Sequence, residues 1–148
     1  MLRAAARSHL VTVLLLWLAF ALPAAADGAR IAAPEARAIR AVIEAQLDAF
    51  RHDDAVRAFS YATDSIHQHF GTAEVFMEMV RSEYAVVYRP TSVEFDEPAR
   101  FDDVVIQPVH MTDTAGNAWL ALYPMEHRAD GTWQINGCRL VELPGKRV

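Results

Sequence analysis

The sequence predicts an α+β fold in which N-terminal helices pack into a curved antiparallel β-sheet, after a cleaved signal peptide. Two observations predict this class. Apolar residues recur at helical spacing from Pro34 to about Val86, and beyond Pro90 they recur with a period of two between turn signals. Helices followed by an antiparallel meander make an α+β arrangement. At 148 residues the chain has the length of one domain.

Residues 1–26 have the three parts of a secretory signal peptide. Two arginines give a positive start, Leu10–Leu22 is an uncharged apolar run of 13 residues, and Ala24–Ala26 is a small-residue cleavage site. A membrane-spanning helix needs about 20 apolar residues, so the run is short for an uncleaved anchor, the alternative interpretation. We expect cleavage between Ala26 and Asp27, an exported protein, periplasmic or secreted, and no membrane attachment afterwards.

Charge and cysteine content narrow the class of protein further. The net charge of −5 becomes −7 without the signal peptide, because that segment carries two basic residues and no acidic ones. With Lys146 as the only lysine, this acidity excludes binding to nucleic acid, which needs clustered basic residues. A single cysteine forms no intrachain disulfide, so the hydrophobic core alone stabilises the fold. We expect a leader over 27–33, one domain over 34–143 and a tail over 144–148.

The first helix is predicted over Pro34–Arg51, where one face carries Ile39, Val42, Ile43, Leu47 and Phe50. Asp53 or Asp54 then caps a second helix, because an aspartate side chain accepts a hydrogen bond from the free N–H groups of the first turn. That helix is expected to direct Val56 and Phe59 inward and to end near Tyr61.

Two further helices follow in the sequence. Asp64 or Ser65 starts a short helical turn that ends at Phe70 before Gly71. Thr72 is the predicted cap of a longer helix over Ala73–Val86. Its expected inward residues are Val75, Phe76, Met79, Val80 and Tyr84, which repeat at helical spacing.

The second half of the chain alternates like antiparallel strands. Alternation is weak over Thr91–Ala99 and stronger over Val104–Thr112 and Ala118–Arg128. Asp113–Asn117 is the expected turn between the two stronger strands. Asp130-Gly131 is a hairpin signal leading into the last strand.

The segment from Thr132 to Glu142 holds the only cysteine. Its bulky apolar residues are Trp133, Ile135, Cys138 and Leu140. All four share one face if Asn136-Gly137 forms a β-bulge, which shifts the alternation by one residue. The alternative is a hairpin turn at Asn136-Gly137, followed by a separate short strand. In either case we expect Cys138 to point into the core as a structural thiol, since Arg139 would point to the opposite face and could not activate it.

Each of the two stronger strands contains a proline, which has no backbone N–H group. Pro108 and Pro124 cannot donate a ladder hydrogen bond. With the turn centred on Ala115-Gly116 they come nearly opposite each other, so we predict a local break in pairing there that bends the sheet around the helices.

Three segments resemble the domain of unknown function 4864 family: QLDAFRHDDAVRAFSYA, FGTAEVFMEMV and the closing DGTWQINGCRL. The resemblance covers about Ile39 to Leu143. That family is similar to the nuclear-transport-factor-2-like superfamily, also called cystatin-like or SnoaL-like. The resemblance implies a cone-shaped fold, with helices cupped by a curved sheet around a cavity. Some superfamily members isomerise steroids or dehydrate and cyclise polyketides, whereas others bind or dimerise. No catalytic motif transfers to named positions.

Both faces of the two central strands are apolar, which is unusual for a sheet covered on one side. One face carries Trp119, Ala121, Tyr123 and Met125, and the other carries Ala118, Leu120, Leu122 and Pro124. We expect the outer face to be covered by a second copy of the chain, giving a homodimer. In the cone fold, sheet-to-sheet packing is the natural arrangement for it.

Candidate chemical groups each have a simpler interpretation. His67 and His69 lie two residues apart on a predicted helix, where their side chains diverge by roughly 200°, so we expect surface histidines and no metal site. Asp53 and Asp54 are predicted to cap a helix. We therefore predict no metal, no cofactor and no assigned catalytic residue. The candidates for an acid or base facing a cavity are Asp48, His110 and His127.

The leading functional hypothesis is a non-enzymatic exported module that binds a small apolar or amphipathic ligand, or a protein partner. Amphipathic side chains that could line its cavity are Tyr61, Tyr84, Tyr88, Trp119 and Tyr123. One alternative is an isomerase or dehydratase that uses an acid or base in the cavity. Another is a structural subunit of an envelope complex.

Overall fold

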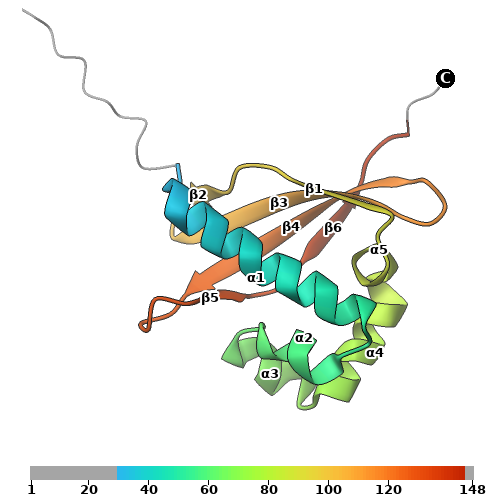
Figure 1. The fold of residues 1–148 in the computed structure, drawn as a ribbon, viewed down its shortest axis with the longest axis horizontal. Helices are drawn as coiled ribbons and strands as arrows, with labels where there is room; N and C mark the ends of the chain where they lie inside the picture. Colours follow the sequence, from blue (N-terminus) through green and yellow to red (C-terminus); the bar gives the residue numbers. More distant parts are fainter. Residues whose placement is uncertain (1–29, 146–148) are drawn as a thin grey trace, which may run out of the picture.

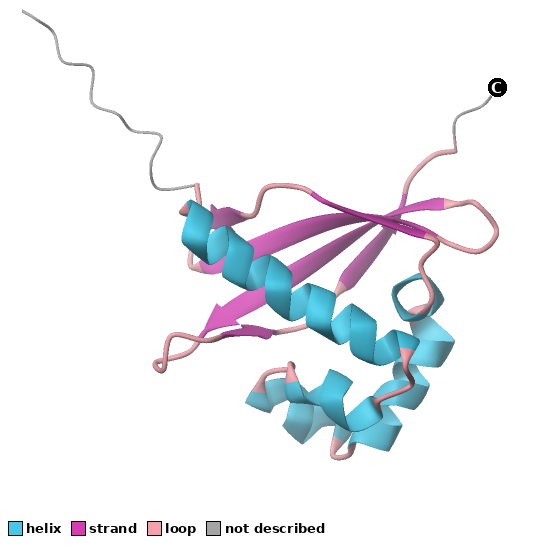
Figure 2. Ribbon diagram, in the orientation of Figure 1, coloured by secondary structure: helices cyan, strands magenta, loops and turns pink. Residues whose placement is uncertain are grey.

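The computed structural model describes residues 30–145, so the expected signal peptide over 1–26 lies outside the described residues, as do 27–29 and 146–148. The described chain forms two layers (Figure 1). Figure 2 shows helices on one side and a curved antiparallel sheet on the other. Helices come first in the chain and strands second, which confirms the predicted α+β class.

The longest helix, α1 (Ala33–Arg51), lies across the concave face of the sheet (Figure 1). Its predicted apolar face is confirmed, and its buried side chains are Ile39, Ile43, Gln46, Leu47, Ala49 and Phe50. The chain just before α1 already belongs to the fold, because Ile31 is buried and Arg30 bridges to Ala99.

Helix α2 (Ala55–Ser60) packs against α1 and α4. Asp54 caps it by accepting a hydrogen bond from the Arg57 N–H at 3.0 Å, as predicted. The sequence pattern predicts that Val56 points inward, but Val56 is 70% exposed, and Ala58 is the buried residue of α2. A helix of six residues has too few turns for its apolar spacing to define which face meets the core.

Helices α3 (Asp64–Phe70) and α4 (Ala73–Glu83) follow, separated by Gly71 with φ +75°. Thr72 caps α4 by accepting from the Val75 N–H at 3.2 Å, as predicted. Val75 itself is 53% exposed, contrary to the predicted inward face, which is formed by Phe76, Met77 and Val80. It lies in the first turn of α4, beside the cap.

The predicted helix over Ala73–Val86 is wrong in its length. It ends at Glu83, and a separate short helix, α5 (Ala85–Tyr88), follows. Tyr84 between them has φ −126° and ψ 45°, outside helical values. Its hydroxyl donates to the carbonyl oxygen of Cys138 at 3.0 Å, so tertiary structure holds the break.

The sheet has six strands in which every strand pair is antiparallel. They are β1 (Ser92–Phe95), β2 (Ala99–Phe101), β3 (Val104–Thr112), β4 (Ala118–His127), β5 (Trp133–Ile135) and β6 (Arg139–Glu142). The weak strand predicted over Thr91–Ala99 is therefore two strands, and both pair with β3. An isolated parallel bridge from Ala62 to Ile135 ties the helical layer to β5.

The predicted break in pairing at the prolines is wrong. The β3–β4 ladder is continuous from Val105–Met125 to Thr112–Ala118. Pro108 lies opposite Leu122, and Pro124 lies opposite Ile106.

At each proline, the strand edge that lacks the N–H donor faces away from the β3–β4 ladder. The Pro124 carbonyl accepts from Asn136 N–H at 2.8 Å, and the Pro108 carbonyl accepts from Asp96 N–H at 3.2 Å. In an antiparallel strand the N–H and C=O of one residue point to the same side. The strand edge where each proline lacks an N–H therefore faces a gap between two neighbouring strands. For Pro108 on β3 the gap lies between β1 and β2, and for Pro124 on β4 it lies between β5 and β6.

The Asn136-Gly137 segment is a bulge, the interpretation favoured by the sequence. Ile135 pairs with Met125 and Arg139 pairs with Leu122, so three residues on one strand face two on β4. Gly137 has φ +127°, a conformation that other residues rarely adopt. The extra residue keeps Ile135 and Leu140 on the concave face.

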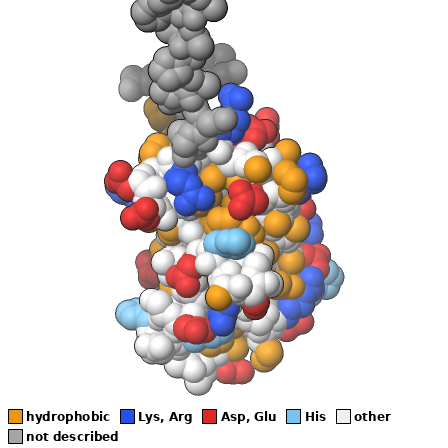
Figure 3. Space-filling view, turned by 90° about the vertical axis from the view of Figure 1, so that its left-hand side faces the viewer, with side chains coloured by type: hydrophobic (Ala, Val, Ile, Leu, Met, Phe, Trp, Pro, Cys, Tyr) orange, Lys and Arg blue, Asp and Glu red, His pale blue; other side chains and the backbone are white. Residues whose placement is uncertain are grey.

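The outer face of the sheet is apolar at its centre. Its apolar side chains are Phe101, Val104, Ile106, Pro108, Leu120, Leu122, Pro124 and Val141. Phe101 is 61% exposed and Val104 44% exposed. Figure 3 looks onto the side where the β2–β3 hairpin lies in Figure 1, and hydrophobic side chains are visible in its upper half. No helix within residues 30–145 is both long and apolar enough to cross a membrane.

Candidate functional site

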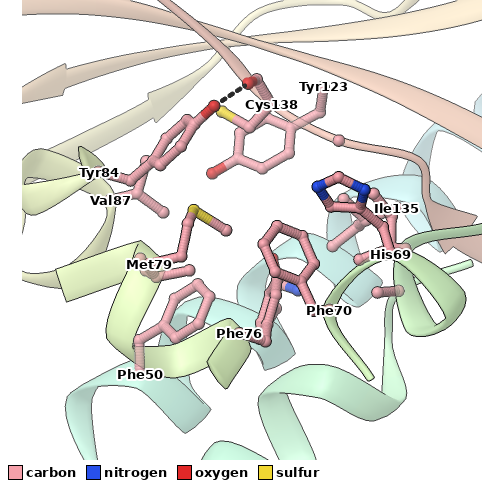
Figure 4. Close-up of a pocket in the computed structure, with 15 residues that line it drawn as sticks. Phe50, His69, Phe70, Phe76, Met79, Tyr84, Val87, Tyr123, Ile135 and Cys138 are labelled. Carbon is pink, nitrogen blue, oxygen red and sulfur yellow. Dashed lines mark hydrogen bonds between the residues drawn. The ribbon is translucent and has the colours of Figure 1, made fainter. Parts of the chain in front are cut away.

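A cavity of about 250 Å³ lies between the helices and the concave face of the sheet (Figure 4). It is larger than the roughly 150 Å³ apolar cavity that holds benzene in an engineered protein, and close to the lower end, about 300 Å³, of typical ligand pockets. It is lined by Gln46, Phe50, Ala62, Ile66, His69, Phe70, Phe76, Met79, Val80, Tyr84, Val87, Tyr123, Ile135, Gly137 and Cys138.

The helical wall of the cavity is aromatic. Phe76 on α4 lies 6.2 Å from Phe50 and 5.6 Å from Phe70, measured between ring centroids. Phe59 stacks behind Phe76 at 5.1 Å. These rings come from four helices, and Met79 and Val80 of α4 line the cavity beside them.

Two tyrosines add polar groups to the cavity, Tyr84 from the junction of α4 and α5 and Tyr123 from β4. The Tyr84 hydroxyl donates a hydrogen bond to the Cys138 carbonyl oxygen. Tyr123 on β4 is 1% exposed, and its hydroxyl points toward the space beside Met79 and Val87 (Figure 4). Burial raises the pKa of Tyr123 well above its usual value, so the hydroxyl keeps its proton.

Cys138 lies beside these tyrosines, half-buried and packed against the core. Burial raises the pKa of its thiol to about 12, while the Tyr123 hydroxyl opposes this shift. The thiolate, which is the reactive form, is therefore scarce at neutral pH. We therefore interpret Cys138 as a structural thiol in the cavity wall.

Another hollow, of about 400 Å³, lies between α1 and β1, next to Phe95. Charged side chains line it, among them Arg40, Glu44 and Arg51. Arg40 bonds to Glu44 at 2.7 Å and lies over the Phe95 ring, so these groups already have partners. The apolar cavity is the better candidate for a binding site.

The family model for DUF4864, a domain of unknown function, matches residues 32–148. The chain belongs to this family. No curated protein and no solved structure matches the chain. Every residue that lines the cavity falls inside the segment that the DUF4864 model matches.

Of the five amphipathic candidates in this DUF4864 chain, Tyr84 and Tyr123 line the cavity. The other three lie elsewhere. The Tyr61 carbonyl accepts from Ile135 N–H, and the Tyr88 hydroxyl donates to Asp53. The Trp119 indole N–H donates to Asp113 at 3.0 Å. Trp119 shares the concave face with Tyr123, but it lies beside the β3–β4 turn.

The three acid or base candidates lie outside the cavity. Asp48 accepts from Arg57 at 2.9 Å and from Arg51, and these bonds lower the pKa of its carboxyl. His110 bonds to Asp96 on the outer face at 2.9 Å. His127 stacks on Trp133 with a centroid distance of 4.6 Å.

The two histidines of α3 point into different surroundings, as their helical spacing predicts, but His67 is half-buried and not the surface residue expected from the sequence. The His67 ring packs on Phe59 and bonds to its carbonyl oxygen at 2.6 Å. His69 is exposed and lies at the edge of the cavity. Within residues 30–145, no three His, Cys, Asp or Glu side chains are grouped so that they could hold a metal ion. Nor does an Asp or Glu line the cavity in this part of the chain.

Sequence reasoning missed several lining residues. The sequence pattern indicates only a surface or metal-binding position for His69, and a core position for Cys138. The apolar spacing of α4 did mark Phe76, Met79 and Val80 as inward. It could not show that a space remains in front of them, because that depends on the distance between the two layers.

Proposed function

We propose that the protein binds a small, largely apolar molecule in the cavity between its helices and its sheet. The observation that carries this proposal is an apolar space of about 250 Å³ with a continuous aromatic wall and few polar atoms. Such concave, mostly apolar sites with a few placed polar groups are typical of ligand pockets.

The cavity favours binding over acid–base catalysis. An isomerase or dehydratase needs an acid or base with a shifted pKa inside the site. Asp48, His110 and His127 each have partners elsewhere. His69, at the exposed edge, is the one imidazole beside the cavity among the described residues.

Two features of the chain set the context of this proposal. The segment over 1–26 has the pattern of an export signal, so we infer that the ligand is met outside the cytoplasm. The curved sheet, the covering helices and the space between them support kinship with the nuclear-transport-factor-2-like superfamily, whose members use a cone-shaped cavity.

The test is a fluorescence titration of the purified protein with N-phenyl-1-naphthylamine, an uncharged apolar probe. Met79 lines the cavity from α4, so Met79→Trp fills it and is expected to weaken probe binding more than tenfold. Val75→Trp is the matched control. It adds the same side chain to the same helix at a position that is 53% exposed and outside the cavity, and should bind the probe like the wild type.

If Met79→Trp and the wild type bind the probe equally, the cavity is not the binding site and the proposal is lost. Native mass spectrometry of protein purified from its own envelope complements this test. It detects a retained small molecule and also stable association with another envelope protein, which would favour the structural-subunit alternative.

A second proposal concerns the outer face of the sheet, which we assign to a second copy of the chain. Phe101, Val104 and Val141 are exposed around a half-buried apolar centre. Monomeric soluble proteins rarely expose contiguous apolar patches larger than a few hundred Å². Two such sheets packed face to face would exclude this surface from water.

The charges at the two edges of this patch favour a self-complementary arrangement. Glu94 on β1 and Arg139 on β6 both point to the outer face and flank its apolar centre from opposite sides. A two-fold axis parallel to the strands places the β1 edge of one copy over the β6 edge of the other. Glu94 of each copy then lies near Arg139 of its partner, in pairs at the polar rim.

A further inference from the structure

One hydroxyl inside the cavity has no hydrogen-bond partner. Among the buried side-chain nitrogen and oxygen atoms of residues 30–145, Tyr123 Oη alone makes no hydrogen bond. Leaving a buried polar group unpaired costs about 1–3 kcal/mol, so native proteins seldom do it without a reason. The Cys138 thiol contacts the Tyr123 hydroxyl and contributes to its raised pKa, but the contact lacks the geometry of a hydrogen bond, and a thiol is a weak donor and a weak acceptor.

Two other polar side chains of the cavity have partners within the protein, and His69 is exposed at its edge. Tyr84 donates its hydroxyl proton to the Cys138 carbonyl at 3.0 Å. The Gln46 amide donates to the Ala58 carbonyl at 3.1 Å. The contrast singles out Tyr123, whose hydroxyl points into the cavity from β4 (Figure 4).

Charge around the cavity restricts what can pair with this hydroxyl. Within the described part of the chain, neither Lys nor Arg lines the cavity, and its one histidine, His69, lies at the exposed edge. A ligand carboxylate placed beside Tyr123 would be a buried charge without a cationic partner, which is costly. A neutral oxygen acceptor satisfies the hydroxyl without that penalty.

We propose that the ligand carries an uncharged oxygen acceptor, such as a ketone carbonyl, on an apolar frame of one or two rings, and that the Tyr123 hydroxyl donates a hydrogen bond to it. This inference rests on the proposed function. It adds the class of ligand and the residue that selects it.

The test compares three compounds that share one frame: 1-tetralone, tetralin and tetralin-1-carboxylate. Isothermal titration or ligand-observed NMR gives the Kd of each with the wild type and with Tyr123→Phe. The quantity of interest is the ratio of the tetralin Kd to the 1-tetralone Kd. We expect this ratio to fall about tenfold in Tyr123→Phe, since one net hydrogen bond is lost.

Tyr84→Phe is the matched control. It removes a hydroxyl of the same kind from the same cavity, but one that already donates to the protein. We expect its ratio to equal that of the wild type. Circular dichroism and thermal unfolding of both variants establish that each is folded before the ratios are compared.

The outcomes separate the two proposals. If tetralin and 1-tetralone both bind and the ratio is the same in the wild type and Tyr123→Phe, the cavity binds apolar molecules but the role of Tyr123 is disproved. Tighter binding of the carboxylate than of the ketone likewise overturns the neutral acceptor. If none of the three compounds binds the wild type, the proposed function falls, and this inference falls with it.

Discussion

Tyr84 and Tyr123 line the same cavity, yet their hydroxyls are in opposite situations. Tyr84 Oη donates to a backbone carbonyl, whereas Tyr123 Oη is buried without a partner. Removing an unsatisfied buried group relieves a desolvation cost, and removing a bonded one leaves its partner unpaired. Phenylalanine substitution should therefore shift stability in opposite directions at the two positions.

We expect Tyr123→Phe to raise the free energy of unfolding by about 1 kcal/mol and Tyr84→Phe to lower it by about 1 kcal/mol. Urea unfolding of the ligand-free protein, followed by circular dichroism, measures both. The slope of unfolding free energy against urea should be the same in all three proteins. A loss of stability in Tyr123→Phe would mean that its hydroxyl already has a partner.

Cys138 allows a second prediction at the scale of a single residue. Burial raises the pKa of its thiol from 9.0 to about 12. At pH 8 this lowers the thiolate fraction by about a thousandfold, and only the thiolate attacks a disulfide reagent. We expect folded protein to react with 5,5′-dithiobis(2-nitrobenzoate) about a thousandfold more slowly than protein unfolded in urea. Comparable rates in the two states would contradict the structural assignment of this thiol.

At the scale of elements, Asp53 connects the α1–α2 turn to α4 and α5. Its carboxylate accepts from the Tyr88 hydroxyl, from Arg81 at 3.2 Å and from Arg89 at 3.1 Å. The Tyr88 hydrogen bond, followed by that of Arg81, lowers the pKa of Asp53. Asp53 also has φ +54°, so one residue provides both the turn conformation and the connection.

This connection predicts a pH dependence of stability. The folded state holds Asp53 at a lower pKa than the unfolded chain, so its contribution is present above about pH 3.9 and is lost as pH falls through the folded pKa. Asp53→Asn should be less stable than the wild type at pH 7, and the difference should shrink as the solution is acidified below about pH 4. Thermal unfolding at a series of pH values measures it.

Asp102 supplies a control for this pH dependence. It is an exposed aspartate with nearly the same backbone conformation, φ +52°, and it makes no ion pair within the described residues. Asp102→Asn should be as stable as the wild type at every pH. If both variants behave alike, the effect belongs to the turn conformation and not to the charge.

The elements that the sequence predicted well are those with strong local patterns. β3 matches the predicted Val104–Thr112, because two-residue alternation is bounded by a turn that Asp113 closes with its own side chain. α1 matches within one residue, since five apolar positions repeat over its full length. In both cases the local pattern and the tertiary position agree.

The sequence-based predictions fail where tertiary contacts determine the local structure. The break at Tyr84 depends on a hydrogen bond to Cys138, 54 residues away. The orientation of the prolines depends on which neighbour each missing donor faces, a question of sheet order and not of spacing. The cavity depends on how far the layers stand apart. Its tyrosines could be proposed from the sequence, but the unpaired hydroxyl of Tyr123 could not.

At the scale of the whole molecule, the two faces of the sheet have different surroundings. The concave face is covered by helices, with the cavity between them. The convex face carries an apolar centre flanked by Glu94 and Arg139. Light scattering of the purified protein at tens of micromolar is expected to give the mass of a dimer. Phe101→Asp should weaken association, since Phe101 is 61% exposed and contributes little to the monomer core.

Val56→Asp tests whether any added charge has this effect. Val56 is 70% exposed but lies on α2, on the helical side of the molecule, so this variant should remain dimeric. Charge reversal tests the orientation of the two copies. Glu94→Arg or Arg139→Glu alone should weaken the dimer, because each places like charges together at the rim, and the double variant should recover it. A monomeric wild type would remove the proposal. A dimer that tolerates each single reversal would require a different two-fold axis.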